Sequence, residues 1–161
     1  MTEPPDLHHR PALPWWQPWV ALGLFSFLLH FVWEMLQVPL YEQMSGARHW
    51  AAVLRCTRAS AGDAVIVWTA YALAAGSARD RWWLGVRHRG RPLTVYLAAG
   101  LLITVGLEWF NVYVRRQWGY SPEMPVILGI GLTPLLQWLL VPLLALWLAR
   151  RHLCMREGGD G

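Results

Sequence analysis

Two series of polar residues run through otherwise apolar parts of the chain, and each series has the spacing of one helix face. The first series comprises Ser26, His30, Glu34, Gln37 and Tyr41, in steps of four, four, three and four residues. The second series comprises Thr104, Glu108, Asn111 and Arg115, in steps of four, three and four residues. Side chains at such steps line up on a helix of 3.6 residues per turn. The sequence therefore predicts two polar stripes, each with one glutamate.

These residue types suit proton transfer in an apolar environment. Carboxylates and imidazoles act as general acids and bases when their surroundings adjust their proton affinity. We predict His30, Glu34 and Glu108 as the acid–base residues, with either glutamate as the acid and His30 as the base or the orienting group. The predicted binding residues are Trp33, Gln37, Tyr41, Asp63, Tyr71, Asn111 and Gln137. No metal is expected; the alternative is a site made by His30, Glu34, Asp63 and Glu108, whose single histidine argues against it.

Several of these residues also have a purely structural interpretation. His30 and Glu34 can form a buried pair one turn apart, and Asp63 can cap the start of a helix. The amides of Asn111 and Gln137 can join two helices by hydrogen bonds. The sequence leaves both interpretations open for each of these residues.

The composition predicts where the stripes lie. The 161-residue chain is 55% hydrophobic and 15% charged, its mean hydropathy is +0.28, and 12 of its residues are Trp. These values argue against a disordered chain and against a soluble domain. Apolar segments run at about 19–40, 63–78, 93–114 and 124–149, and roughly 20 such residues span a membrane. The second segment can span only if it also takes in residues such as 59–62, or if the bilayer thins around it. We predict an all-α fold, a bundle of four transmembrane helices.

The arginines predict the orientation of the bundle. All 14 basic residues are Arg, and with four spans nine of them share the side of the two termini. The side richer in arginine is normally cytoplasmic. Residues 1–18, which hold five prolines and should be disordered, and the tail 150–161 are then cytoplasmic. In the outer connection, residues 49–56 predict a short helix on the membrane surface, which we expect to cover the bundle mouth near Trp50.

The polar residues are expected to converge at one depth. Glu34 and Glu108 each lie about 15 residues from the cytoplasmic start of their segments, or roughly 22 Å. Asp63 opens the second segment at its outer end, and His30 lies one turn deeper than Glu34. A carboxylate that faces lipid costs about 2.5–3.5 kcal/mol on insertion scales. We therefore predict an outward-facing polar pocket in which Glu34 and Glu108 face each other within reach of His30.

One string of residues resembles a pattern in small bacterial inner-membrane proteins. It is Leu29-His30-Phe31-Val32-Trp33-Glu34-Met35-Leu36-Gln37-Val38-Pro39-Leu40-Tyr41, followed by Cys56 and Gly62-Asp63. The resemblance covers most of the chain and implies a four-helix fold in the bacterial inner membrane, without an activity. The arrangement is also similar to that of sterol-isomerase and related EXPERA membrane proteins, which set a His and a Glu one turn apart, with a second Glu and a Trp nearby. The matching residues here are His30, Glu34, Glu108 and Trp109 or Trp138.

Three classes of function remain open at this point. The first is a membrane enzyme that uses acid–base chemistry on a lipid or isoprenoid-like substrate. The second is a proton-linked carrier or channel, which would need an oligomer because a 161-residue chain has little wall for a pore. The third is an assembly subunit that pairs its stripes with a partner membrane protein. The pI of 9.6 does not indicate a nucleic-acid partner, because the arginines sit in short clusters between apolar runs. No cofactor is fixed by the sequence.

Overall fold

The computed structural model describes residues 16–44, 46–81, 83 and 90–157, and these form a helical bundle. Its long helices are α1 (Gln17–Gln37), α2 (His49–Ala78), α3 (Gly90–Trp109) and α4 (Leu132–Glu157). A 3-10 helix, η1 (Val38–Leu40), extends α1, and a π-helix, η3 (Phe110–Val114), extends α3. Two short antiparallel strands, β1 (Val126–Ile127) and β2 (Ile130–Gly131), precede α4. The predicted all-α class is confirmed.

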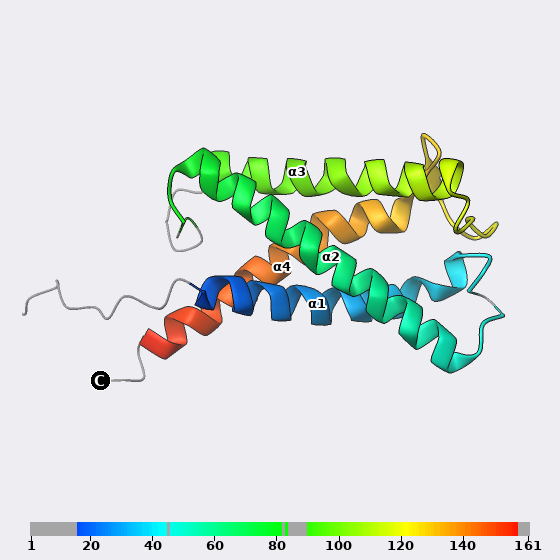
Figure 1. Ribbon diagram of the computed structural model, residues 1–161, viewed down its shortest axis with the longest axis horizontal. Coiled ribbons are helices and arrows are strands. Elements are labelled where there is room, and N and C mark those ends of the chain that lie inside the picture. Colours follow the sequence, from blue (N-terminus) through cyan, green and yellow to red (C-terminus); the bar gives the residue numbers. More distant parts are fainter. Residues whose placement is uncertain (1–15, 45, 82, 84–89, 158–161) are drawn as a thin grey trace, which may run out of the picture.

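The helices are arranged as two lengthwise helices and two oblique ones. α1 and α3 run along the long axis, while α2 and α4 cross the bundle obliquely (Figure 1). α1 packs on both α2 and α4, and α2 also packs on α3. The start of α1 and the end of α4 lie at one end of the bundle (Figure 1). Residues 38–44, 46–48 and 115–131 lie at the opposite end, which we call the loop end.

Three helical segments are long and apolar enough to cross a membrane. They are Gln17–Leu40, Gly90–Val114 and Leu132–Leu153. On α1, one face carries apolar side chains that are 50–74% exposed, namely Val20, Leu24, Leu28, Val32 and Leu36. The opposite face buries Ser26, His30 and Gln37. A helix that buries its polar face and exposes its apolar face suits a lipid environment rather than water.

Small residues allow the helices to approach closely. Ala70 and Ala74 of α2 are fully buried in the core. Gly100 of α3 lies against the ring of Trp138 on α4, where even a Cβ would collide with the indole. In the same way, Gly23 of α1 lies against the indole of Trp68 from α2, where a Cβ would collide with the ring. Small residues at helix crossings are the usual means of packing in membranes.

The structure corrects two predicted boundaries at the loop end. Residues 49–56 are the first turns of α2 and not a separate surface helix, because the helix continues without a break to Ala78. The predicted fourth segment, 124–149, begins too early, since α4 starts at Leu132. The hairpin before it turns at Leu128 and Gly129, which both have positive φ (50° and 83°), as in a type I′ turn.

The ends of the predicted membrane domain also change. α1 begins at Gln17, so residues 17 and 18 belong to the helix and not to a disordered segment. Residues 1–15 of that segment lie outside the described part of the chain. α4 continues to Glu157, so most of the expected tail 150–161 is helical.

Candidate functional site

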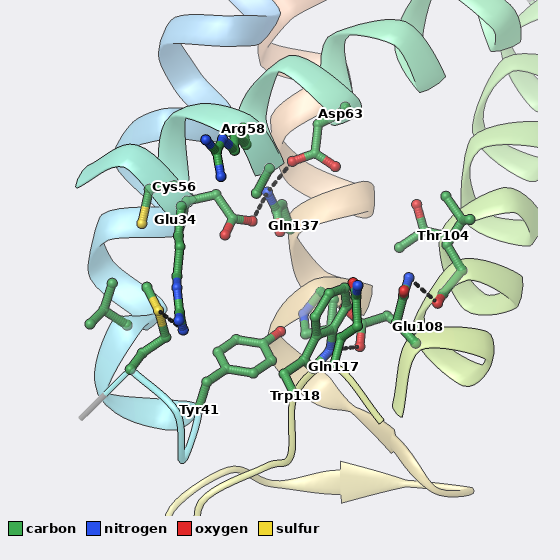
Figure 2. A pocket seen from close by; sticks show the side chains of 18 of the residues that line it. Glu34, Tyr41, Cys56, Arg58, Asp63, Thr104, Glu108, Gln117, Trp118 and Gln137 are labelled. Atoms are coloured by element: carbon green, nitrogen blue, oxygen red, sulfur yellow. Dashed lines mark hydrogen bonds between the residues drawn. The ribbon is translucent and has the colours of Figure 1, made fainter. Parts of the chain in front are cut away.

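A cavity of about 900 Å³ lies between the helices at the loop end. Each long helix contributes a polar side chain to its wall: Glu34 from α1, Asp63 from α2, Glu108 from α3 and Gln137 from α4 (Figure 2). Tyr41, which follows η1, and residues 117–118 close the cavity at its end. Three carboxyl groups and an amide therefore face one space.

The cavity opens sideways between α2 and α3. The end of α2 and the start of α3 lie close together, and the two helices diverge toward the loop end (Figure 1). On this side the lining comes from residues 55–66 of α2, residues 104–108 of α3 and Asn111 of η3, which belong to the diverging halves. Val65 and Leu107 line the cavity from the two helices and are 55% and 45% exposed. The opening thus meets the apolar surface of the bundle.

One group of polar side chains, the floor cluster, joins α1, α2 and α4. Gln137 Nε2 lies 2.7 Å from His30 Nδ1, and it donates to Glu34 Oε1 at 3.2 Å and to Asp63 Oδ2 at 3.3 Å. His30 Nδ1 also lies 3.3 Å from Asp63 Oδ2. Gln37 Nε2 donates to Glu34 Oε1 at 2.8 Å. The cluster ties three helices together through one amide.

The position of one ring proton decides the hydrogen-bond pattern of the floor cluster. If His30 Nδ1 accepts from Gln137, the proton is on Nε2, which is buried without a partner among the described residues. If Nδ1 carries the proton, it donates to Asp63, and the ring offers no acceptor to the Gln137 amide. The amide nitrogen has two hydrogens for three surrounding acceptors, so it serves two of them at a time.

Glu108 lines a different part of the wall with Tyr41 and Trp118; together with Tyr120, which is hydrogen-bonded to Glu108, we call this group the aromatic corner. Glu108 Oε2 accepts hydrogen bonds from Trp118 Nε1 at 3.2 Å and from Tyr120 Oη at 2.8 Å. The rings of Tyr41 and Tyr120 lie 5.9 Å apart. Burial raises the pKa of the Tyr120 phenol well above its ordinary value. The phenol therefore keeps its proton and acts as a donor to Glu108.

The end of α3 explains how the aromatic corner forms. The backbone N–H of Arg115 donates to Phe110 O at 2.8 Å, closing a π-helical turn. Arg116 then adopts a left-handed conformation (φ 51°), and Gln117 N donates to Asn111 O at 2.9 Å. A π-turn followed by a left-handed residue reverses the chain direction. Residues 118 and 120 are thereby folded back onto Glu108.

The cover of the cavity is a clasp between residues 38–44 and 117–121. Ser121 N donates to Leu40 O at 3.0 Å, and Glu42 N donates to Gly119 O at 3.1 Å. Gly119 N donates to the side-chain oxygen of Gln43 at 2.8 Å. We expected residues 49–56 to cover the mouth with Trp50. This was wrong: Trp50 is 68% exposed and is not part of the cavity wall.

The floor cluster contains several of the sequence-predicted site residues. The structure brings together His30, Glu34, Gln37, Asp63 and Gln137. Asp63 lies in the middle of α2, so it does not cap a helix. His30 is fully buried behind the wall and does not line the cavity.

Other predicted residues lie at the same cavity without joining the floor cluster. Tyr41 and Asn111 line it, and the Asn111 amide donates to Leu107 O of its own helix at 2.8 Å. Glu108 shares the cavity with Glu34, but its hydrogen bonds go to the aromatic corner and not to His30. Among the described residues, no three His, Cys, Asp or Glu side chains lie together in an arrangement that could hold a metal ion.

Two predicted binding residues lie elsewhere. Tyr71 is fully buried in the other half of the bundle, where its hydroxyl donates to Arg81 O at 3.1 Å and its ring packs on Trp19 at 4.9 Å. The spacing of eight residues correctly puts Tyr71 on the same face of α2 as Asp63, but it also puts Tyr71 about two turns along the helix, away from the cavity. Trp33 is half-buried and does not line the cavity.

Sequence reasoning missed several residues of the wall. Arg55, Cys56 and Arg58 line the cavity from the outer half of α2, and Trp118 and Tyr120 form the aromatic corner. Arg55 lies eight residues before Asp63, about two helical turns, which was an available signal. Residues 117–121 carry no helical or strand periodicity, so their return to Glu108 was not readable from spacing.

Comparisons with known proteins leave the family open. No protein-family model, no curated protein and no solved structure matches this chain.

Proposed function

We propose that this protein is an integral enzyme of the bacterial inner membrane, with four spans and both termini in the cytoplasm. Its reaction is acid–base chemistry on a lipid or isoprenoid-like substrate. The observation that carries the proposal is the cavity, which opens toward the apolar surface of the bundle and presents carboxyl groups from several helices. A substrate with a lipid tail can reach such a site from within the bilayer.

In this proposal α2 is the fourth span. Its 30 residues extend for about 45 Å, which exceeds the roughly 30 Å of bilayer hydrocarbon and allows an oblique course. The polar part of the helix, with Arg55, Arg58 and Asp63, faces the cavity rather than lipid. An even number of spans agrees with the placement of both described chain ends at one end of the bundle (Figure 1).

The two glutamates divide the chemistry in this proposal. Glu34 on α1 and Glu108 on α3 reach the substrate from different walls, so that one can donate a proton while the other accepts one. His30 lies behind the wall and acts as a positioning residue. It holds Asp63 directly and Glu34 through the amide of Gln137.

The test uses the purified full-length protein in liposomes made from a total bacterial lipid extract in deuterated water. We expect wild-type protein to change the mass of one lipid class, through conversion or through deuterium gained at carbon. Glu34→Gln and Glu108→Gln should each reduce the rate by about 100-fold or more, because a general acid or base typically contributes that much. Glu123→Gln, at an exposed carboxylate outside the cavity, is the matched control and should keep the wild-type rate.

Two results would overturn the proposal. One is a lipid profile that is the same with wild-type protein and with the Glu34→Gln variant. The other is proton flux into the liposomes that depends on Glu34 while no lipid changes, which would support a proton-linked carrier instead.

A further inference from the structure

Besides Glu34 and Asp63 of the floor cluster, the cavity wall carries two further sets of charge, on different helices. Arg55 and Arg58 line it from α2, and Glu108 lines it from α3 together with Tyr41 and Trp118 (Figure 2). Neither set is neutralised by the other, since no ion pair joins them among the described residues. A ligand that fits this wall has to meet both signs of charge.

The two arginines have free hydrogen-bonding capacity. Arg58 makes no hydrogen bond or ion pair within the described part of the chain, and its guanidinium points into the cavity (Figure 2). Arg55 makes only long contacts, to Gln43 O at 3.4 Å and to Met44 Sδ at 3.6 Å. The two residues lie three positions apart, so their side chains leave α2 on one face. Guanidinium groups placed together at a membrane protein surface match the oxygens of a phosphate.

The aromatic corner suits an organic cation. Trp118 and Tyr120 both donate to Oε2 of Glu108, and Oε1 has no hydrogen-bond partner among the described residues. The rings of Tyr41 and Trp118 flank the same space. A carboxylate beside aromatic rings attracts an ammonium group through charge and through cation–π contact.

A ligand with a single sign of charge does not fit this wall. A simple anion would face the three carboxyl groups of Glu34, Asp63 and Glu108, and a simple cation would face Arg55 and Arg58. A ligand that joins a phosphate to an ammonium satisfies both. Because the cavity opens between α2 and α3, acyl chains attached to such a head group would extend along the apolar surface of the bundle.

We propose that the cavity binds the head group of a zwitterionic phospholipid, with the phosphodiester at Arg55 and Arg58 and the ammonium at Glu108, Tyr41 and Trp118. This rests on the proposed function in one respect: the bound lipid is the substrate that the glutamates act on. The binding geometry itself does not depend on any reaction.

The test measures binding to the delipidated full-length protein in detergent by native mass spectrometry. The probes are phosphatidylethanolamine, phosphatidylglycerol, which lacks the ammonium, and soluble glycerophosphoethanolamine, which lacks the acyl chains. We expect phosphatidylethanolamine to bind at least tenfold more tightly than either of the other two. Arg55→Gln combined with Arg58→Gln should weaken its binding at least tenfold, whereas Arg48→Gln, at an exposed arginine outside the cavity, should not.

The Glu108→Gln variant separates the two halves of the site. It should lose the preference for phosphatidylethanolamine over phosphatidylglycerol while it keeps the dependence on the two arginines. Equal binding of both lipids by wild-type protein would overturn the proposal, and so would tight binding of glycerophosphoethanolamine, which would point to a free solute. Selective lipid binding without any lipid conversion would refute only the proposed enzyme, and conversion of a lipid that lacks an ammonium would refute only this inference.

Discussion

Replacing Gln137 by Leu removes the amide that connects α4 to α1 and α2. Gln137 Nε2 is within hydrogen-bond distance of His30, Glu34 and Asp63, but an amide nitrogen has two hydrogens and serves two acceptors at a time. Interhelical hydrogen bonds in membrane proteins contribute about 0.6 kcal/mol on average and up to about 1.7 kcal/mol. Loss of two of them should therefore lower the free energy of unfolding by about 1–3 kcal/mol. Leu has a volume similar to that of Gln, so little of this loss comes from packing.

The measurement is reversible unfolding in mixed micelles, followed by circular dichroism as the fraction of denaturing detergent increases. Gln117→Leu is the matched control, because this glutamine lines the same cavity and its side chain makes no hydrogen bond among the described residues. Its unfolding free energy should change by less than about 0.5 kcal/mol. If Gln137→Leu is as stable as the wild type, the floor cluster does not hold the helices together, and our reasoning about His30 as a positioning residue through this amide is wrong.

Two further predictions concern a thiol and a glycine. Cys56 is almost fully buried, so alkylation of its thiol by iodoacetamide at pH 7 should be slow. Alkylation as fast as that of an exposed cysteine would contradict this. Gly100→Ala should cost about 1–3 kcal/mol of unfolding free energy, because the new methyl group collides with the Trp138 ring, whereas Gly106→Ala on the same helix meets open space and should cost nothing. Equal melting temperatures for these two variants would show that α3 and α4 are not packed as described.

The sequence was informative about helices whose hydropathy is uniform. The segments at 19–40 and 93–114 agree closely with α1 plus η1 and with α3 plus η3, because each is apolar over its whole length. The spacing in α1 also identified the buried face, since a polar side chain in lipid is too costly to leave outside. The same cost explains why the five predicted polar residues of the floor cluster, from three helices, face one another and not the outer surface of the bundle.

The sequence was misleading where hydropathy and secondary structure do not coincide. The first half of α2 contains Arg55 and Arg58, so low hydropathy suggested a break in a helix that is continuous. The opposite error occurred at the hairpin, where Val126 to Ile130 are apolar but turn at Leu128 and Gly129. A type I′ turn normally carries Asn or Asp before the glycine, and a leucine there gives no turn signal.

The hydrogen-bond partners of Glu108, Trp118 and Tyr120, could not be found from periodicity. They reach Glu108 because the chain reverses direction after η3, and not because they share a helix face with it. The floor cluster is built by side chains of packed helices, so its geometry is fixed by the same contacts that hold the bundle together. The aromatic corner instead depends on a π-turn, a left-handed residue at Arg116 and the short clasp to residues 40–43. Only a few hydrogen bonds attach residues 117–121 to the rest of the bundle, and none of these bonds is made by a residue of the hydrophobic core between the helices. Opening the corner would therefore expose Glu108 while the floor cluster stays intact.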